Sequence, residues 1–209
     1  MTLKRTLAIA CAIALSITGT AGAQGPTEQK GLKIGSTTVG GTITVGGRYT
    51  TIDGVASGIL DVKAGIVLDQ TWGIGFGFAA PYLDKRLTTL VADGTYHMST
   101  GYSGIYIERY FRFSDDFVAS ASVLMGQGVI MYQYDKEYRT QKAWRDEVID
   151  QTTFAVFEPA ISAQYRLGGS FWLGVTATIR NTSPVQLLGT SESIFRKGGV
   201  GMTARWDLF

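Results

Sequence analysis

The sequence is short of the residues on which metal, thiol and disulfide chemistry depend. Its 209 residues include one cysteine, Cys11, and one histidine, His97. A single cysteine cannot close an intramolecular disulfide, and a single histidine supplies no cluster of ligands for a metal ion. The sequence therefore predicts no metal site and no thiol chemistry.

The sequence also lacks an excess of charge, a long apolar segment and a nucleotide-binding motif. Lys and Arg number 19 against 17 Asp and Glu, so no basic surplus favours nucleic acid as a partner. No segment beyond the N-terminus has the roughly 18 consecutive apolar residues of a membrane-spanning helix. The 27 glycines mostly follow a period of two, so matches to GxG do not indicate a phosphate-binding loop. No nucleophile elbow is present, and we predict no cofactor.

The N-terminus has the three parts of a secretory signal peptide. Lys4 and Arg5 provide the basic start, residues 7–17 form an apolar stretch, and small residues precede a cleavage position after Ala23. The apolar stretch is too short to span a bilayer as a helix, which takes about 20 residues. We therefore predict a signal peptide at residues 1–23. Its removal from the 209 residues leaves 186, with no cysteine and 17 charged residues of each sign.

Beyond the signal, apolar and polar residues alternate with a period of two. In the C-terminal stretch, every second residue from Val200 to Leu208 is apolar. This period is typical of β-strands with one apolar and one polar face. We expect a flexible periplasmic lead-in at residues 24–36 and then one domain over residues 37–209. The eight strands expected in this domain lie at about residues 41–50, 58–69, 71–81, 101–113, 116–132, 153–167, 170–181 and 199–209.

The connections between the expected strands alternate in length. Those after the second, fourth and sixth strands are tight turns, whereas those after the third, fifth and seventh span about residues 82–100, 133–152 and 182–198. Short turns on one rim and long loops on the other are typical of transmembrane β-barrels in the outer membrane of Gram-negative bacteria. With an even number of strands, both termini lie on the periplasmic side.

Charged residues in the expected strands fall on the face opposite the apolar one. In a membrane barrel that face is the lumen, where charges must pair because an unpaired buried charge is costly. Eight strands enclose only enough room for side chains, so we predict a packed polar lumen. A water-soluble, lipocalin-like binder would need an apolar interior, and these charges argue against it. The predicted lumen network comprises Arg48, Asp61, Lys63, Asp69, Glu108, Arg112, Glu158, Arg166, Arg180, Arg205 and Asp207.

Aromatic residues gather at the ends of the expected strands, as in the two interfacial girdles of a membrane barrel. The predicted periplasmic girdle comprises Trp72, Phe111, Phe113, Phe117, Tyr165, Phe171 and Trp206. The predicted outer girdle comprises Tyr49, Tyr82, Tyr102, Tyr132 and Phe154. Arg109 is an exception on the lipid face, a few residues from the periplasmic end, where its long side chain can reach the headgroups.

Two irregularities are expected inside strands. The alternation slips near residues 126–128, which predicts a β-bulge. Pro159 follows Glu158 within a strand, where a proline removes a ladder hydrogen bond. This pair predicts either a second bulge, with Glu158 paired to a lumen arginine, or a strained functional site.

In this architecture the chain resembles the small eight-stranded outer-membrane barrels, the class of the transmembrane domain of outer membrane protein A. The runs GYSGIYIERYFR, FVASASVLMGQGV and FAVFEPAISAQYRLGGSFWLGVTATIR are similar to uncharacterised outer-membrane barrels of Bacteroidota-type bacteria. The resemblance implies an all-β, eight-stranded antiparallel up-and-down transmembrane barrel. Its expected partners are membrane lipid and, through the C-terminal strand, the barrel-insertion machinery. Phe209 departs from the usual insertion signal, because Leu208 keeps the phase of Trp206 and Phe209 does not.

The single histidine suggests one enzymatic alternative. His97 and Ser99 share a face if the chain is extended there, and Glu108 follows in the next strand. This set is similar to the His/Ser/Glu residues of outer-membrane lipid A deacylases, and a hydroxyl activated by a carboxylate-oriented imidazole is a hydrolase arrangement. Glu108 falls on the lumen face rather than the lipid face, so the favoured interpretation of His97 and Ser99 is two solvated loop residues.

The long loops are the remaining candidates for function. Residues 133–152 are strongly charged, with Tyr138 and Trp144 among them, and form either a platform for an extracellular ligand or protein, or only a solvated connection. Residues 182–198 can fold over the barrel mouth through Leu187, Leu188, Ile194 and Phe195. We therefore expect a structural or surface-binding role and no enzymatic activity. A narrow porin-like channel is the first alternative, and a lipid-modifying enzyme is the second.

Overall fold

The structure, a computed structural model, describes residues 31–83, 85–87, 96–134 and 148–208. The predicted signal peptide lies outside this part of the chain and stays a prediction, and so does the phase of Phe209. None of the described residues forms a helix that is long and apolar enough to cross a membrane. The described residues form ten strands: β1 Leu32–Ile34, β2 Thr37–Ile52, β3 Val55–Leu68, β4 Trp72–Tyr82, β5 Tyr96–Arg112, β6 Phe117–Tyr134, β7 Val148–Gly168, β8 Phe171–Ile179, β9 Asn181–Thr182 and β10 Gly198–Asp207.

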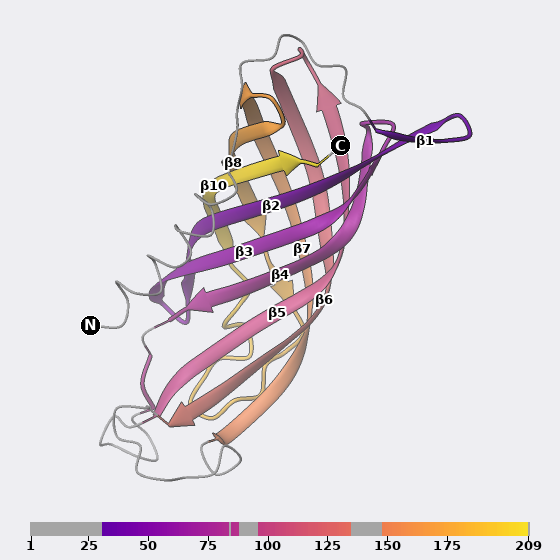
Figure 1. The fold of residues 1–209 in the computed structure, drawn as a ribbon. Coiled ribbons are helices and arrows are strands. Elements are labelled where there is room, and N and C mark those ends of the chain that lie inside the picture. Colours follow the sequence, from indigo (N-terminus) through magenta and orange to yellow (C-terminus); the bar gives the residue numbers. More distant parts are fainter. Residues whose placement is uncertain (1–30, 84, 88–95, 135–147, 209) are drawn as a thin grey trace.

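Eight of these strands close into a ring. They pair antiparallel in the order β2, β10, β8, β7, β6, β5, β4 and β3, and the pairing of β3 with β2 completes the circle. Figure 1 shows the tilted strands wrapping around a common interior. The predicted eight-stranded antiparallel up-and-down barrel is confirmed.

Of the two short strands, β9 continues β8 along β7 in the same register, and β1 is an addition to the ring. β1 pairs with the first residues of β2 around Gly35, whose φ of 64° suits a tight turn. This hairpin projects from the rim that also holds the C-terminus (Figure 1). Residues 32–34 of the predicted lead-in, residues 24–36, thus form a hairpin with the start of β2. Residues 24–30 lie outside the described residues, and the division into a lead-in and a domain over residues 37–209 stays a prediction.

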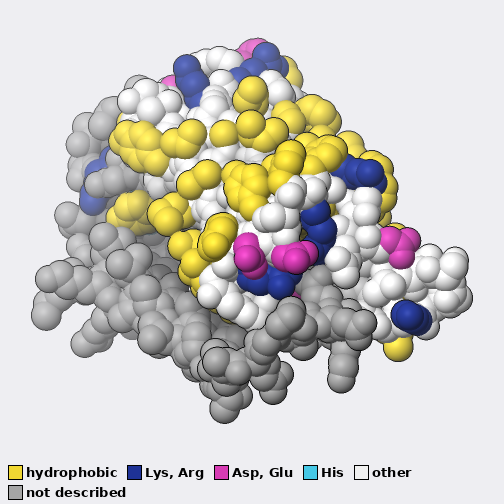
Figure 2. Space-filling view, turned by 90° about the horizontal axis from the view of Figure 1, so that it is seen from above, with side chains coloured by type: hydrophobic (Ala, Val, Ile, Leu, Met, Phe, Trp, Pro, Cys, Tyr) yellow, Lys and Arg dark blue, Asp and Glu magenta, His cyan; other side chains and the backbone are white. Residues whose placement is uncertain are grey.

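The wall of the barrel is apolar outside and polar within. Outward side chains such as Phe76 (71% exposed), Ile161 (65%) and Val200 (61%) alternate with buried Thr, Ser, Arg and Glu. Figure 2 shows hydrophobic side chains over much of the visible wall and charged side chains gathered in a few groups. This is the polarity of a membrane barrel and the reverse of that of a soluble one.

The bulge predicted at residues 126–128 is absent. β5 and β6 stay in register through this stretch, and the one shift between β6 and β7 falls between Tyr132 and Gln133. The apparent slip arises because the lumen becomes apolar at this height, so the inward residues lose their polarity. Glycine is needed there for space, because a Cβ at Gly126 would clash with the carbonyl oxygen of Ser103.

No bulge occurs at Pro159 either, because both register shifts of β7 lie near its ends. β7 pairs with β8 from Ala160 and with β9 at Val156 and Phe157, and the register is the same on both sides of the gap. The predicted bulge is wrong because Pro159 lies at the break between the two pairings, where no ladder hydrogen bond from its nitrogen is required.

The barrel wall is uneven in height. β5, β6 and β7 have 17, 18 and 21 residues, whereas β4 and β10 have 11 and 10. The extra length lies at the end where the long connections leave, at the bottom of Figure 1. Most outward residues there, such as Ser99, Gln133 and Gln151, are polar, and Met131 and Ile149 are the apolar exceptions. The extension is therefore more polar on its outer face than the band below it.

Candidate functional site: the lumen and its extracellular mouth

A central cluster of charged side chains closes the lumen in its extracellular half. The guanidinium of Arg48 on β2 contacts Asp61 on β3 at 2.8 Å and Glu158 on β7 at 2.7 Å. All three side chains are buried. The pair with Glu158 ties two separate parts of the wall together across the lumen, because β10 and β8 lie between β2 and β7 in the ring, whereas the pair with Asp61 joins neighbouring strands.

Tyr102 and Arg180 complete this central cluster. The hydroxyl of Tyr102 donates to Glu158 at 2.6 Å and accepts from Arg48 at 3.2 Å. Arg180 donates to the carbonyl oxygen of Phe195 at 3.1 Å and lies 5.5 Å from the ring centres of Tyr102 and Phe195. The cluster is therefore hydrogen-bonded on several sides, as buried charge requires.

A second, periplasmic cluster surrounds Trp172. This side chain is fully buried, and its indole N–H donates to Asp207 at 2.8 Å. The guanidinium groups of Arg166 and Arg205 each lie 4.6 Å from the ring centre of Trp172. Arg205 also pairs with Asp207 at 3.1 Å. A large buried ring with two guanidinium groups against it thus fills the lumen at this level.

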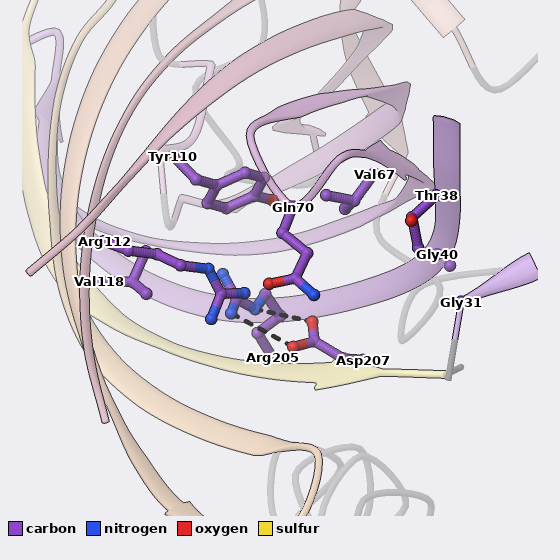
Figure 3. A pocket seen from close by; sticks show the side chains of 11 residues that line it. Gly31, Thr38, Gly40, Val67, Gln70, Tyr110, Arg112, Val118, Arg205 and Asp207 are labelled. Atoms are coloured by element: carbon purple, nitrogen blue, oxygen red, sulfur yellow. Dashed lines mark hydrogen bonds and ion pairs between the residues drawn. The ribbon is translucent and has the colours of Figure 1, made fainter. Parts of the chain in front are cut away.

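A small cavity of about 30 Å³ lies at the periplasmic mouth. Figure 3 shows the side chains of Gln70, Arg112 and Arg205 pointing into it, with Tyr110 and Asp207 alongside. This volume holds about one water molecule. The cavity is therefore a hydration pocket of the mouth rather than a passage.

Two further charged residues face the lumen between the clusters. Glu108 accepts hydrogen bonds from the hydroxyls of Ser120 at 2.5 Å and Tyr110 at 3.2 Å. The ammonium group of Lys63 donates to Ser122 at 3.4 Å and lies 5.5 Å from the ring centre of Tyr106. In this middle layer, hydroxyl groups and an aromatic ring, rather than opposite charges, thus interact with the charged groups of Glu108 and Lys63.

The structure brings together most of the predicted lumen network, with one exception. Asp69 is an exposed turn residue with a φ of 47°, and it accepts a hydrogen bond from the backbone N–H of Thr38 at 2.8 Å. Its prediction as a lumen residue is wrong because the strand ends at Leu68 and the turn reverses the alternation. Arg112 lies at the exposed rim, on the periplasmic cavity.

The outer girdle prediction is wrong for three of its five members. Tyr49 and Tyr82 face outward, with 60% and 63% of their surface exposed. Tyr102, Tyr132 and Phe154 are buried in the lumen instead. Their position near strand ends suggested an interfacial role, but their place in the alternation, in phase with Tyr106 in β5 for example, turns them inward.

These inward rings belong to an apolar cap, the packed side chains that fill the extracellular end of the lumen. The cap includes Ile52, Leu83, Leu87, Tyr96, Met98, Ile130, Tyr132, Phe154, Val156, Val185, Leu187, Ile194 and Phe195. Its last four members come from the mouth segment, residues 183–197, which enters the barrel from the end of β9. The ring of Phe195 stacks on Phe154 with centres 4.9 Å apart. The expectation that this segment covers the mouth agrees with these contacts, except that Leu188 is exposed.

The rim around the cap is tied to the short β2–β3 turn. Asp53 and Gly54 form this turn with positive φ angles, as two-residue hairpins require. Asp53 forms an ion pair with Lys85 beyond β4. Partial burial at this rim lowers the pKa of Lys85. The turn therefore anchors neighbouring connections.

The predicted periplasmic aromatics lie on the outer wall near the short turns. Trp72, Phe111, Phe113, Phe117 and Tyr165 are exposed. Phe171 and Trp206 are partly exposed and pack on each other with ring centres 5.0 Å apart. Their assignment to the membrane interface stays a prediction.

The structure does not bring together the three residues of the enzymatic alternative, His97, Ser99 and Glu108. His97 and Ser99 share the outward face of β5, as expected, but Glu108 faces the lumen and lies nine residues along the strand. At about 3.4 Å per residue, the carboxylate is roughly 30 Å from Ser99. No group of three or more potential metal ligands occurs among the described residues.

The charged loop proposed as a platform lies mostly outside the described residues. β6 continues to Tyr134 and β7 begins at Val148, so the connection is shorter than the predicted 133–152. Its first and last residues belong to the tall part of the wall. Asp150 in this part accepts a hydrogen bond from the N–H of Leu188 at 2.9 Å, which ties β7 to the mouth segment.

Comparison with known proteins identifies the fold and no closer relationship. No family model matches the chain, and no curated protein matches its sequence. Its structure is similar to that of the Neisserial surface protein A, with a TM-score of 0.54 and 7% identity over 82% of this chain and 99% of that one. Lower similarity is found to the N-terminal β-barrel domain of OprF from Pseudomonas aeruginosa (TM-score 0.47, 8% identity, 80% and 97% covered). For Ail, the attachment invasion locus protein of Yersinia pestis, the TM-score is 0.46 and the identity 11%, over 81% of this chain and 96% of that one.

The chain thus has the fold of the small eight-stranded outer-membrane β-barrels. The apolar band on its outer wall is the surface that such a barrel turns to lipid. Fold and band together are those of a protein of the bacterial outer membrane.

Proposed function

We propose that this protein is a non-conducting outer-membrane anchor that presents a binding surface to the exterior through the tall wall of β5, β6 and β7 and the connection at its tip. The observation that supports the proposal is the uneven wall. Strands that only cross the bilayer need about 9–11 residues, whereas β7 has 21.

The extension is built as a rigid support. Its inner face packs against the apolar cap, in which Phe154 and Val156 of β7 meet Phe195 of the mouth segment. Its outer face is mostly polar, so it is less suited to lipid than the apolar band. A rigid wall that rises above the membrane and ends in a charged, aromatic-containing connection is suited to contact another surface.

Replacement of residues 135–147 by a Gly-Ser linker tests the surface role. Bacteria that produce the wild-type protein are expected to adhere to surfaces coated with extracellular-matrix proteins more than cells that lack it. With the linker, adhesion falls to the level of cells without the protein, because the contact residues are gone while the barrel stays folded.

The matched control puts a Gly-Ser linker in place of residues 114–116, the short turn on the opposite rim. This variant should adhere like the wild type. Unchanged adhesion in the 135–147 variant, with equal amounts of folded barrel in the membrane, contradicts the proposed surface role.

A narrow channel is the second candidate, and the charged lining of the periplasmic mouth favours it. The guanidinium groups of Arg112 and Arg205 lie there on the wall of the small cavity. To conduct, the protein must open the periplasmic cluster around Trp172, the central cluster and the apolar cap above it.

A further inference from the structure

The outer wall carries one feature that neither the lumen nor the loops explain. Arg109 is the one charged side chain on the outward face of the described ring strands, at a position surrounded by Ile107 and Phe111. Its guanidinium lies 4.8 Å from the ring centre of Trp72 on β4. No carboxylate among the described residues pairs with it.

The depth of Arg109 makes this cation costly unless it meets an anion. It lies three residues before β5 ends at Arg112, which is roughly 10 Å along a strand. The cost of an arginine on the lipid face is highest at the bilayer midplane and falls toward the interface. A guanidinium at this depth is within reach of lipid phosphate groups, which it can bind through two parallel hydrogen bonds.

A groove opens beside Arg109 and runs up the wall toward the outer leaflet. It has a volume of about 710 Å³ and is lined by Trp72 and Arg109 at one end and by Phe157 and Ile179 at the other. Alanines at positions 121 and 177 form part of its floor, which lets the groove continue into a second hollow of about 820 Å³. Both volumes lie within the roughly 300–1,000 Å³ of ordinary ligand sites.

We propose that Arg109, Trp72 and this groove form a site for one phospholipid of the periplasmic leaflet. The phosphate group binds the guanidinium of Arg109, which Trp72 holds in place, and one acyl chain lies in the groove over Ala121. Charge complementarity selects this occupant: the groove alone fits any apolar chain, but its cationic end fits a chain that carries an anion at headgroup depth. The site is independent of the proposed surface role.

Native mass spectrometry of the refolded barrel tests the proposal. The protein, released from detergent with one equivalent of a palmitoyl-oleoyl phosphatidylglycerol, is expected to retain a single lipid, whereas a diacylglycerol without phosphate is lost. Arg109→Gln should lower the retained fraction about tenfold. Ala121→Phe, which fills the groove and leaves the cation, should lower it similarly.

The matched control is Ala64→Phe, the same substitution on the outward face of β3, away from the groove. It should retain lipid like the wild type, and heat-modifiable gel migration should show all variants folded. Retention that is unchanged in both Arg109→Gln and Ala121→Phe overturns the site. Displacement of the lipid by inorganic phosphate, or a second copy of the chain in its place, also overturns it.

Discussion

Arg48→Met lowers the free energy of unfolding by about 3–5 kcal/mol, the cost of removing one partner from a buried ion pair. Arg48 is the shared partner of Asp61 and Glu158, at 2.8 and 2.7 Å. Without it, two buried carboxylates lie close to each other with no cation between them. Urea unfolding of the barrel in lipid vesicles, followed by tryptophan fluorescence, measures the loss.

A compensated variant separates charge from packing in this experiment. Arg48→Met combined with Asp61→Asn and Glu158→Gln removes the two carboxylates that would lack a cation, so part of the lost stability should return. Arg180 stays charged in this variant and keeps its hydrogen bond to the carbonyl oxygen of Phe195. Lys33→Met, at an exposed position on β1, should change nothing measurable. A loss below about 1 kcal/mol for Arg48→Met alone contradicts the account of the central cluster as a bridge across the lumen.

Trp172→Ala has a comparable effect at the other end of the lumen. Truncation of a fully buried aromatic side chain costs about 3–5 kcal/mol, because its contacts are lost and a cavity remains. Here Arg166 and Arg205 also lose the ring face between them, and Asp207 loses the indole donor. The same urea titration detects this loss.

Trp172→Phe is the graded control for the periplasmic cluster. It keeps a ring between the two guanidinium groups but removes the N–H that donates to Asp207. A hydrogen bond to a charged group contributes about 1.5–3 kcal/mol, so the expected loss is smaller than for alanine. Equal losses in the two variants would contradict the role assigned to the ring.

The alternation of residues was enough to predict the ring of strands and the inward position of most charges. It works because side chains in a strand point to opposite faces, whichever partner the strand has. The alternation was misleading near the extracellular end, where the inward side chains are themselves apolar. Tyr132 and Ile130 continue the inward phase of Ser120 and Ser122, but their apolar character made the pattern look broken and suggested a bulge.

The site could be predicted only in part, because pairing across the lumen leaves no local pattern. Arg48 and Glu158 are 110 residues apart in sequence, so their contact depends on the closure of the whole ring. The mouth segment has no period either, and its apolar residues alone did not show that Phe195 would meet Phe154 and Arg180. Asp69 shows an error of local origin. The predicted strand was one residue too long, and the alternation therefore placed Asp69 in the lumen.

The most direct test of the account is the ion conductance of the refolded mature protein in a planar lipid bilayer. Heat-modifiable gel migration first confirms that the inserted protein is folded. The central cluster, the ring of Trp172 and the apolar cap predict no steady current through the folded barrel. Steady single-channel current from the wild-type protein would contradict the closed lumen and would favour the narrow channel instead.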